Sequence, residues 1–212
     1  MAHRDMVVIG ASAGGLEALQ RLLGALPGNL DAAVLVVLHT SNHEGSVLPN
    51  ILGRAGPLPV SHPKDGAAIL KGHVYIAPPN VHMIVADGHL QLIAGPRENL
   101  HRPAIDPLFR SAAAVYGPRV IAVMLTGLLD DGTSGLMVVR ASGGEAIVQD
   151  PDTAMFASMP RSALKQVPDA HVVGLREIPD TLVRLCREPL PPAALVNDPK
   201  RRERKRSQDC GV

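Results

Sequence analysis

The chain of 212 residues is 46% hydrophobic and carries a formal charge of +1, with two Phe, two Tyr and no Trp. This length fits one domain with a tail, and roughly 70% of the unfolded surface can be buried, so folding requires neither a metal nor disulfides. The shortage of aromatic rings argues against a stacking surface for single-stranded nucleic acid. The near-neutral charge gives no separate reason to expect a nucleic-acid partner.

The number of cysteines and the lengths of the apolar runs indicate the cellular compartment. Cys186 and Cys210 are the only two thiols, which favours a reducing environment. The longest apolar runs, at 32–38 and 120–125, are shorter than the ~20 residues that cross a bilayer. The first residues lead into an apolar strand without the features of a signal peptide. We therefore expect a cytoplasmic protein with no membrane insertion.

Short apolar runs alternate with helical patterns along the chain. Strands are expected at 6–9, 32–39, 74–77, 83–86, 89–93, 120–125, 145–149 and 171–175. Helices are expected at 14–26, with Leu16, Leu19, Leu22 and Leu23 on one stripe, and at 47–52, 106–115, 132–141, 160–165 and 178–187. The Asp87-Gly88 pair predicts a hairpin between two of the strands. The alternation predicts an α/β fold, a three-layer α/β/α arrangement with a mainly parallel, doubly wound sheet and a β-hairpin.

The chain end differs in composition from the rest. Residues 198–212 hold six basic and three acidic side chains, a net +3 that leaves −2 for residues 1–197. Such a segment cannot bury enough apolar surface to fold. We expect one domain over residues 1–192 and a disordered basic tail over 193–212, which either solubilises the protein or contacts an acidic partner.

A glycine-rich turn, Gly10-Ala11-Ser12-Ala13-Gly14-Gly15, joins the first expected strand to the first helix. A dinucleotide fingerprint has glycine where this chain has Ser12, and the lysine of a phosphate-binding loop is absent. The spacing Gly10-x-Ser12-x-Gly14 matches a nucleophile elbow, where flanking glycines permit the sharp turn that exposes a serine. The turn therefore favours a serine nucleophile, with nucleotide binding as the alternative.

A nucleophilic serine needs a base, and the base needs an orienting group. His39 ends the second expected strand, and Asp130 and Asp131 follow the strand at 120–125. Because ligand sites lie at the carboxyl ends of parallel strands, these side chains should converge in one crevice. Other interpretations stay open. His39 could bond a loop carbonyl or hold a metal together with His43, and either aspartate could cap the following helix.

Eight separated motifs occur together in one order along the chain. They are Val-Ile-Gly-Ala-Ser12-Ala-Gly-Gly, Val-Val-Leu-His39, Gly72-His-Val-Tyr-Ile-Ala-Pro-Pro, His101-Arg-Pro-Ala-Ile-Asp106-Pro-Leu-Phe, Leu125-Thr-Gly-Leu-Leu-Asp-Asp131-Gly, Gly143-Gly, Gln149-Asp and Met159-Pro-Arg-Ser-Ala. From Val7 to Leu185 the chain resembles the catalytic domain of the CheB-type protein-glutamate methylesterases. The resemblance implies a catalytic triad of Ser12, His39 and Asp131, with the backbone amides of Ala13 and Leu128 as oxyanion donors.

The same resemblance implies an activity and its partners. Members of this family hydrolyse glutamate γ-methyl esters on the cytoplasmic helices of chemoreceptors, releasing methanol, and some also deamidate glutamine. Neither a cofactor nor a metal is expected. The family usually carries a receiver domain before the catalytic domain, whereas here the first strand begins near Met6. We therefore expect either a stand-alone enzyme or regulation by a separate protein such as a response regulator. The alternative is a catalytically silent module that docks to a receptor or signalling partner.

Some positions depart from the family pattern or admit two roles. After the histidine this chain has Thr40 instead of Met-Pro, and Leu128-Leu129 follows Gly127 where the family has Met-Gly. Thr40 is expected to border the pocket. Arg102 is expected to contact an acidic receptor or the aspartate loop, or else to form a structural ion pair or help to start the following helix. Met159 is expected to pack against the ester methyl or simply to begin a helix.

Overall fold

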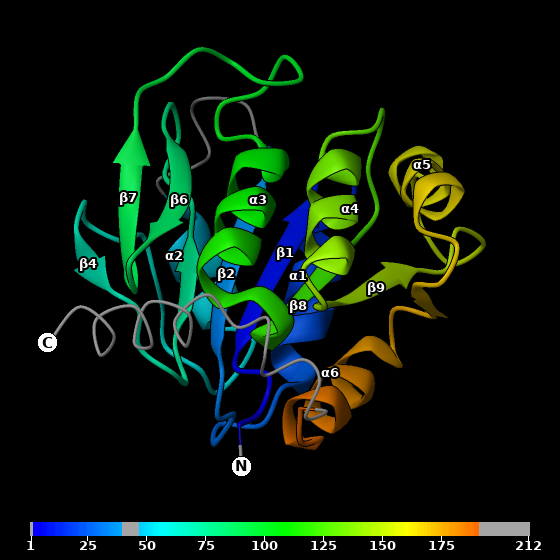
Figure 1. Cartoon of the computed structure of the whole chain (residues 1–212), viewed down its shortest axis with the longest axis horizontal. Helices are drawn as coiled ribbons and strands as arrows, with labels where there is room; N and C mark the ends of the chain where they lie inside the picture. Colours follow the sequence, from blue (N-terminus) through cyan, green and yellow to red (C-terminus); the bar gives the residue numbers. More distant parts are fainter. Residues whose placement is uncertain (1, 40–46, 191–212) are drawn as a thin grey trace, which may run out of the picture.

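Residues 2–39 and 47–190 are the part of the chain that the structure, a computed structural model, describes (Figure 1). The strands are β1 (Met6–Ala11), β2 (Ala33–Leu38), β3 (Val60–Ser61), β4 (Ala67–Ala68), β5 (Val74–Ile76), β6 (His82–Ala86), β7 (His89–Ile93), β8 (Val120–Met124), β9 (Glu145–Gln149) and β10 (His171–Val173). The α-helices are α1 (Gly15–Ala25), α2 (Leu48–Gly53), α3 (Ile105–Tyr116), α4 (Thr133–Ala141), α5 (Ser158–Gln166) and α6 (Ile178–Arg187), and a short 3₁₀ helix covers Gly117–Arg119.

The main sheet has seven strands in the order β10-β9-β8-β1-β2-β5-β3, and every neighbouring pair is parallel. From β1 the chain first adds strands on one side and later returns to add β8, β9 and β10 on the other. A second, antiparallel sheet has the order β4-β7-β6, and its β6–β7 hairpin turns at Asp87 and Gly88, whose φ angles are 52° and 83°. The predicted α/β fold is confirmed. The two-residue strands β3 and β4 were not predicted because they are too short to carry a periodic pattern.

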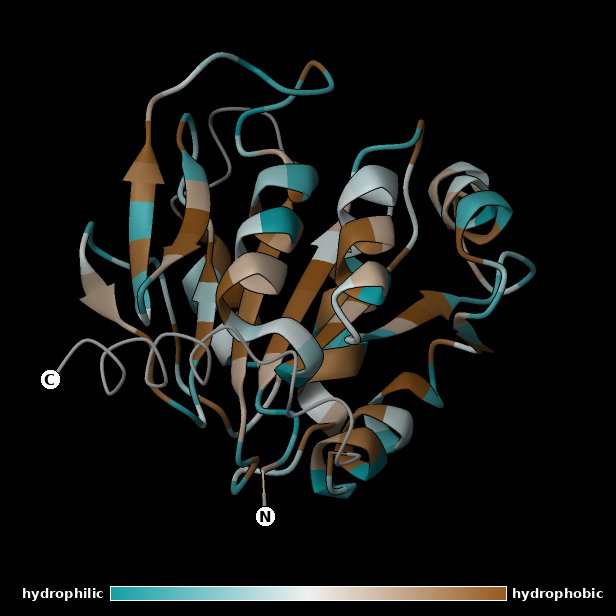
Figure 2. Cartoon of the chain, in the orientation of Figure 1, coloured by the Kyte–Doolittle hydropathy of each residue, from teal (hydrophilic) through white to brown (hydrophobic). Residues whose placement is uncertain are grey.

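Side chains of the central strands alternate between two hydrophobic cores, one on each face of the sheet. Met6 and Val8 of β1 join the core under α3, α4 and α5, whereas Val7 and Ile9 join the core under α1, α2 and α6. All four are at most 2% exposed. Burial on both faces explains why these strands read as continuous apolar runs, and Figure 2 shows them hydrophobic along their length.

The first helix corrects one detail of the sequence prediction. Leu19, Leu22 and Leu23 are buried as expected, but Leu16 is 36% exposed because it lies in the first turn of α1 at the open edge of the sheet. The amide of Leu190 donates to the carbonyl of Ala2, so the two ends of the described part lie together. The expected tail at 193–212 lies outside the described residues. No helix in the described ranges is long and apolar enough to cross a membrane.

Candidate active site

Three strand ends bring Ser12, His39 and Asp131 together at the carboxyl edge of the main sheet. Ser12 follows β1, His39 follows β2, and Asp131 lies in the loop between β8 and α4. Since β1 lies between β2 and β8, the three loops are neighbours. The order of strand addition reverses between β1 and β8, and open α/β sheets bind ligands in the crevice at such a switch point.

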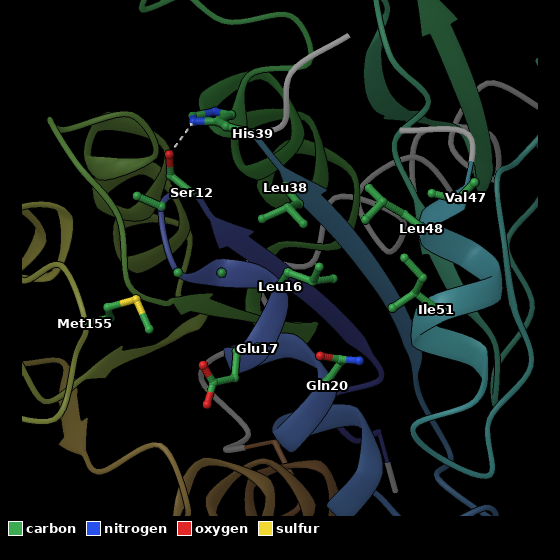
Figure 3. A pocket seen from close by; sticks show the side chains of 13 residues that line it. Ser12, Leu16, Glu17, Gln20, Leu38, His39, Val47, Leu48, Ile51 and Met155 are labelled. Carbon is green, nitrogen blue, oxygen red and sulfur yellow. Dashed lines mark hydrogen bonds between the residues drawn. The ribbon is translucent and has the colours of Figure 1, made fainter. Parts of the chain in front are cut away.

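The imidazole of His39 bridges the other two side chains. Its Nδ1 atom lies 3.2 Å from the Oγ atom of Ser12, and its Nε2 atom lies 2.9 Å from an Oδ atom of Asp131 (Figure 3 draws the first contact). An ionised carboxylate only accepts hydrogen bonds, so Nε2 carries the proton and Nδ1 is left to accept from the serine hydroxyl. Chemically, this arrangement can activate the hydroxyl as a nucleophile.

Asp131 is 1% exposed and its carboxylate is surrounded by donors. One oxygen accepts the amide of Ile105 at 2.7 Å, and the other accepts the amide of Asp106 at 3.2 Å and the side-chain amide of Asn99 at 2.7 Å. Burial alone would raise the pKa of this carboxyl. The hydrogen bonds from His39, Ile105 and Asn99 outweigh burial, so the pKa lies below its usual value and the group is ionised at neutral pH.

The loop before α3 supplies two residues that the sequence analysis did not assign. The side-chain nitrogen of Asn99 donates to both Asp131 and Asp106, at 2.7 and 2.8 Å. The ring of His101 stacks on His39 with 3.6 Å between centroids and 9° between planes. Burial and the neighbouring His39 lower the pKa of His101, which keeps this imidazole neutral. The only sequence signal was the motif that begins at His101, which did not indicate stacking.

Two backbone amides beside Ser12 are candidates for the oxyanion hole. Among the described residues, the amides of Ala13 and Leu128 have no hydrogen-bond partner. The loop that carries Leu128 approaches the nucleophile closely through Gly127. A Cβ atom at Gly127 would lie 2.8 Å from the Cβ atom of Ser12 and 2.6 Å from the sulfur of Met159, so no larger residue fits there. Two unpaired donors beside a nucleophile can stabilise an oxyanion.

Two buried polar side chains tie the three loops to one another. Thr126 and Gln149 are each 1% exposed. The Thr126 amide donates to the Gln149 side chain at 2.9 Å, and the Thr126 carbonyl accepts the Ser12 amide at 3.1 Å. The Thr126 hydroxyl donates to the Ala13 carbonyl at 3.0 Å and accepts the Phe156 amide at 2.8 Å. These bonds fix the relative positions of the loops that follow β1, β8 and β9.

The two consecutive aspartates take different places. Asp131 lies against His39, whereas Asp130 is exposed. Within the described part of the chain, the one group of Asp130 that is engaged is its carbonyl, which accepts the amide of Thr133 at 3.0 Å. Helix α4 is capped by Gly132, which has a φ of 92°, with no side-chain cap. The expectation that one aspartate caps this helix is therefore wrong.

The remaining predicted residues lie at the margin of the site or beyond it. Thr40 and His43 are outside the described residues. Arg102 donates to the carbonyl of Gly95 at 2.7 Å and has no carboxylate partner in the described ranges, so the structural ion pair expected for it is wrong. Met159 is completely buried beneath Gly127, so its side chain supports the loop. Within 2–39 and 47–190, no group of three or more His, Cys, Asp or Glu is placed to hold a metal.

An open cavity of about 850 Å³ extends from Ser12 and His39 between α1 and α2. Its walls are largely aliphatic, with Leu16, Val47 and Met155 among the lining residues (Figure 3). Met155, which is 62% exposed, lines this cavity, whereas Met159, one of whose two predicted roles is a contact with the ester methyl, is not among the lining residues. The cavity has room for an extended acyl side chain and for part of the molecule that carries it.

The fold and the site together define a class of protein. Its members are doubly wound α/β proteins that carry a serine, a histidine and an aspartate, arranged as in serine hydrolases, at the switch point of the sheet. The profile of one family, described as CheB methylesterase, matches residues 7–182. The chain belongs to the CheB methylesterase family. It is also similar to the crystal structure of the Thermotoga maritima CheB methylesterase catalytic domain, with a TM-score of 0.82 and 33% identity over 87% of this chain and 100% of that chain.

Curated relatives differ in how much of their length this chain spans. One from Leptospira interrogans, named putative protein-glutamate methylesterase/protein-glutamine glutaminase, is 36% identical over 182 residues, covering 85% of this chain and 94% of the relative. One from Anaeromyxobacter dehalogenans, named protein-glutamate methylesterase/protein-glutamine glutaminase 5, is 39% identical over 186 residues. The match covers 86% of this chain but 51% of that relative.

Proposed function

We propose that this protein is a protein-glutamate methylesterase that hydrolyses glutamate γ-methyl esters on the cytoplasmic helices of chemoreceptors and releases methanol. The observation that carries the proposal is the continuous hydrogen-bonded path from Ser12 through His39 to Asp131 at the mouth of an open cavity. Membership of the CheB methylesterase family and the names of the relatives support the same activity. Because the substrate is a cytoplasmic segment of a receptor, the proposal places the enzyme in the cytoplasm.

In the first half-reaction Ser12 attacks the ester carbonyl while the Nδ1 atom of His39 takes the hydroxyl proton. Asp131 accepts the Nε2 hydrogen, holds the tautomer and stabilises the imidazolium that forms. The amides of Ala13 and Leu128 donate to the developing oxyanion, and each such donor is worth about 3–4 kcal/mol in the transition state. His39 then protonates the leaving oxygen, so methanol departs and the glutamyl group stays on the serine.

In the second half-reaction a water molecule gives its proton to His39 and attacks the glutamyl-serine ester. The tetrahedral species collapses, Ser12 regains its proton, and a free glutamate side chain leaves. The same steps deamidate glutamine, with ammonia as the first leaving group, and the names of the relatives include this second activity. Every proton and bond is handled by groups of this chain and by water, so no cofactor is proposed.

The test is methanol release from methylated receptor fragments by the wild type, by Ser12→Ala and by Ser134→Ala, each with and without a separately supplied response regulator. Ser134 is exposed on α4 and serves as the matched serine control. We expect Ser12→Ala to lower kcat by about 10⁴-fold or more and to keep its thermal transition, because only the hydroxyl is removed. Wild-type methanol release by Ser12→Ala would exclude this serine as the nucleophile.

A silent docking module is the competing function, and serine-directed labelling separates the two. A fluorophosphonate reacts with an activated serine, so it should modify the wild type at Ser12 and leave His39→Ala unmodified. A wild type that binds receptor fragments without being labelled and without releasing methanol would favour the docking module.

A further inference from the structure

Two leucines beside the triad adopt a backbone conformation that leucine normally avoids. Leu100 has a φ of 69° and Leu129 a φ of 64°. The other non-glycine residues with positive φ in the described chain are Asn80, Asp87 and Asn99, types that tolerate the left-handed region. Bulky residues held in this region mark sites where the surrounding structure sustains strain, and such strain clusters at functional sites.

Burial does not compensate for this strain. The side chain of Leu100 is 74% exposed and that of Leu129 is 56% exposed. The loop contacts of both residues use main-chain carbonyls: Arg97 donates to that of Leu100 at 3.2 Å, and Ser158 donates to that of Leu129 at 3.3 Å. Any residue would supply these carbonyls, and asparagine or glycine would supply them with less strain. The folded state therefore gains nothing evident from a leucine side chain at either position.

Both leucines lie on the loops that hold the triad. Leu129 precedes Asp131 by two residues, and Leu100 lies between Asn99, which donates to Asp131, and His101, which stacks on His39. Figure 2 shows hydrophobic stretches in both loops, between β7 and α3 and between β8 and α4. Five more exposed apolar side chains occupy the same edge of the sheet: Leu16, Val47, Leu128, Met155 and Phe156. The catalytic groups are thus surrounded by apolar surface that solvent contacts.

We propose that Leu100 and Leu129 determine substrate specificity by contacting apolar side chains of the substrate protein next to the ester-bearing glutamate. This proposal rests on the proposed function. On a helical substrate, residues three and four positions from the glutamate share its face at about 5–6 Å. They would therefore meet the rim of the site, formed by Leu100 and Leu129, when the ester reaches Ser12. An apolar neighbour at those positions would bury the exposed leucines, which a polar neighbour would not do.

Contacts remote from the reacting carbonyl act mainly on substrate binding. They are equal in the ground state and the transition state, so their loss raises KM and leaves kcat near its original value. A small ester such as p-nitrophenyl acetate does not extend beyond the nucleophile and the oxyanion donors. The ratio of kcat/KM for a methylated receptor fragment to that for the small ester therefore isolates the contribution of the rim.

The experiment compares Leu100→Asn, Leu129→Asn and the double variant with Leu70→Asn. Leu70 is 59% exposed, is not among the positive-φ residues, and lies near the amino edge of the sheet, so it serves as the matched control. We expect each rim variant to raise KM for the receptor fragment about tenfold, to lower the ratio equally and to keep or raise Tm. Leu70→Asn should leave KM and the ratio unchanged.

Two results would overturn the proposal. The first is a double variant whose KM for the receptor fragment equals that of the wild type. The second is a lower Tm together with an equal fall in kcat/KM for the fragment and for the small ester, which would assign the leucines a structural role. A wild type that releases no methanol from the fragment would instead refute the proposed function, and this inference with it. Wild-type turnover with unchanged KM in the variants would refute this inference alone.

Discussion

The amino edge and the carboxyl edge of the main sheet differ in whether their polar and apolar groups already have partners within the protein. At the amino edge, just before β1, Asp5 is 8% exposed, and its carboxylate receives two hydrogen bonds from Arg119 at 2.8 and 2.6 Å and lies 3.3 Å from the Lys71 amino group. Arg4 pairs with Glu145 at 3.0 Å nearby. At the carboxyl edge, two amides have no partner in the described chain, and two leucines are exposed in left-handed backbone.

This difference indicates that residues at one end of the strands contribute mainly to stability, and those at the other end mainly to catalysis. At the amino edge, buried charges are matched by opposite charges, so removing one partner weakens the compensation of the others. At the carboxyl edge, donors and apolar side chains remain available to a substrate, and the backbone strain there is sustained by the rigid sheet. We therefore expect substitutions at the carboxyl edge to change kinetics and those at the amino edge to change the free energy of unfolding.

The largest effect is expected at Asp131, because this buried residue contributes both to catalysis and to the stability of the folded protein. The Ile105 amide donates to one oxygen of Asp131, and the Asp106 amide and Asn99 donate to the other. In Asp131→Asn one of these oxygens becomes an NH₂ group, which cannot accept a hydrogen bond. We expect kcat to fall about 10³–10⁴-fold and stability to fall by about 1–3 kcal/mol. Methanol release and urea unfolding measure the two losses. A variant with wild-type kcat would exclude Asp131 as the group that orients His39.

The lowered pKa of Asp131 adds a pH dependence to the same variant. The unfolded carboxyl has a pKa of about 4, so the stability from this group is fully present above that value and is lost as pH falls through the lower folded pKa. Asp131→Asn lacks this acid-dependent loss. Urea titrations between pH 7 and pH 3 should therefore show the difference in unfolding free energy shrinking as pH falls.

The amino edge should show the reverse pattern, a loss of stability without a loss of rate. Asp5→Ala removes two partly buried hydrogen bonds from Arg119 and the ion pair with Lys71, and we expect it to cost about 1–3 kcal/mol with kcat unchanged. Asp31→Ala is the matched control, because Asp31 also pairs with Lys71 but its side chain is 78% exposed, and it should cost less than about 1 kcal/mol. Equal losses in both variants, or a fall in kcat, would contradict this difference between the two edges.

The smallest effect is expected at His101. Burial, with the nearby charges of His39 and Arg97, lowers its pKa, whereas Asp131 opposes this shift. The unfolded chain protonates His101 at about pH 6.5, whereas the folded protein protonates it only at lower pH. Protonation therefore favours the unfolded state, and stability decreases as pH falls below about 6.5. His101→Phe keeps a ring against His39 and removes that proton, so we expect less acid destabilisation and kcat within a few-fold of wild type. Acid sensitivity equal to that of the wild type in urea titrations from pH 7 to pH 5 would contradict this assignment.

Much of the fold and part of the site could be predicted because their signals are local. Continuous apolar runs mark strands buried on both faces, and alternation with helical patterns implies parallel connections. Parallel strands place their carboxyl ends at one edge, so the residues after β1, β2 and β8 had to be neighbours there. This reasoning brought Ser12 and His39 together with an aspartate. The pattern alone did not choose between Asp130 and Asp131.

What the sequence by itself determined is therefore the layering of the fold, the edge at which chemistry is placed, and the family. The family resemblance already implied Asp131 as the partner of His39, and in the structure this aspartate lies against His39. Only the tertiary structure decided that Asn99 and His101 support the pair, and that Met155 lines the cavity while Met159 is buried. These outcomes depend on how loops from distant strands pack against one another. The physical reason is that a side chain's partner across a loop is set by backbone angles and long-range packing, which leave no periodic signal in the sequence.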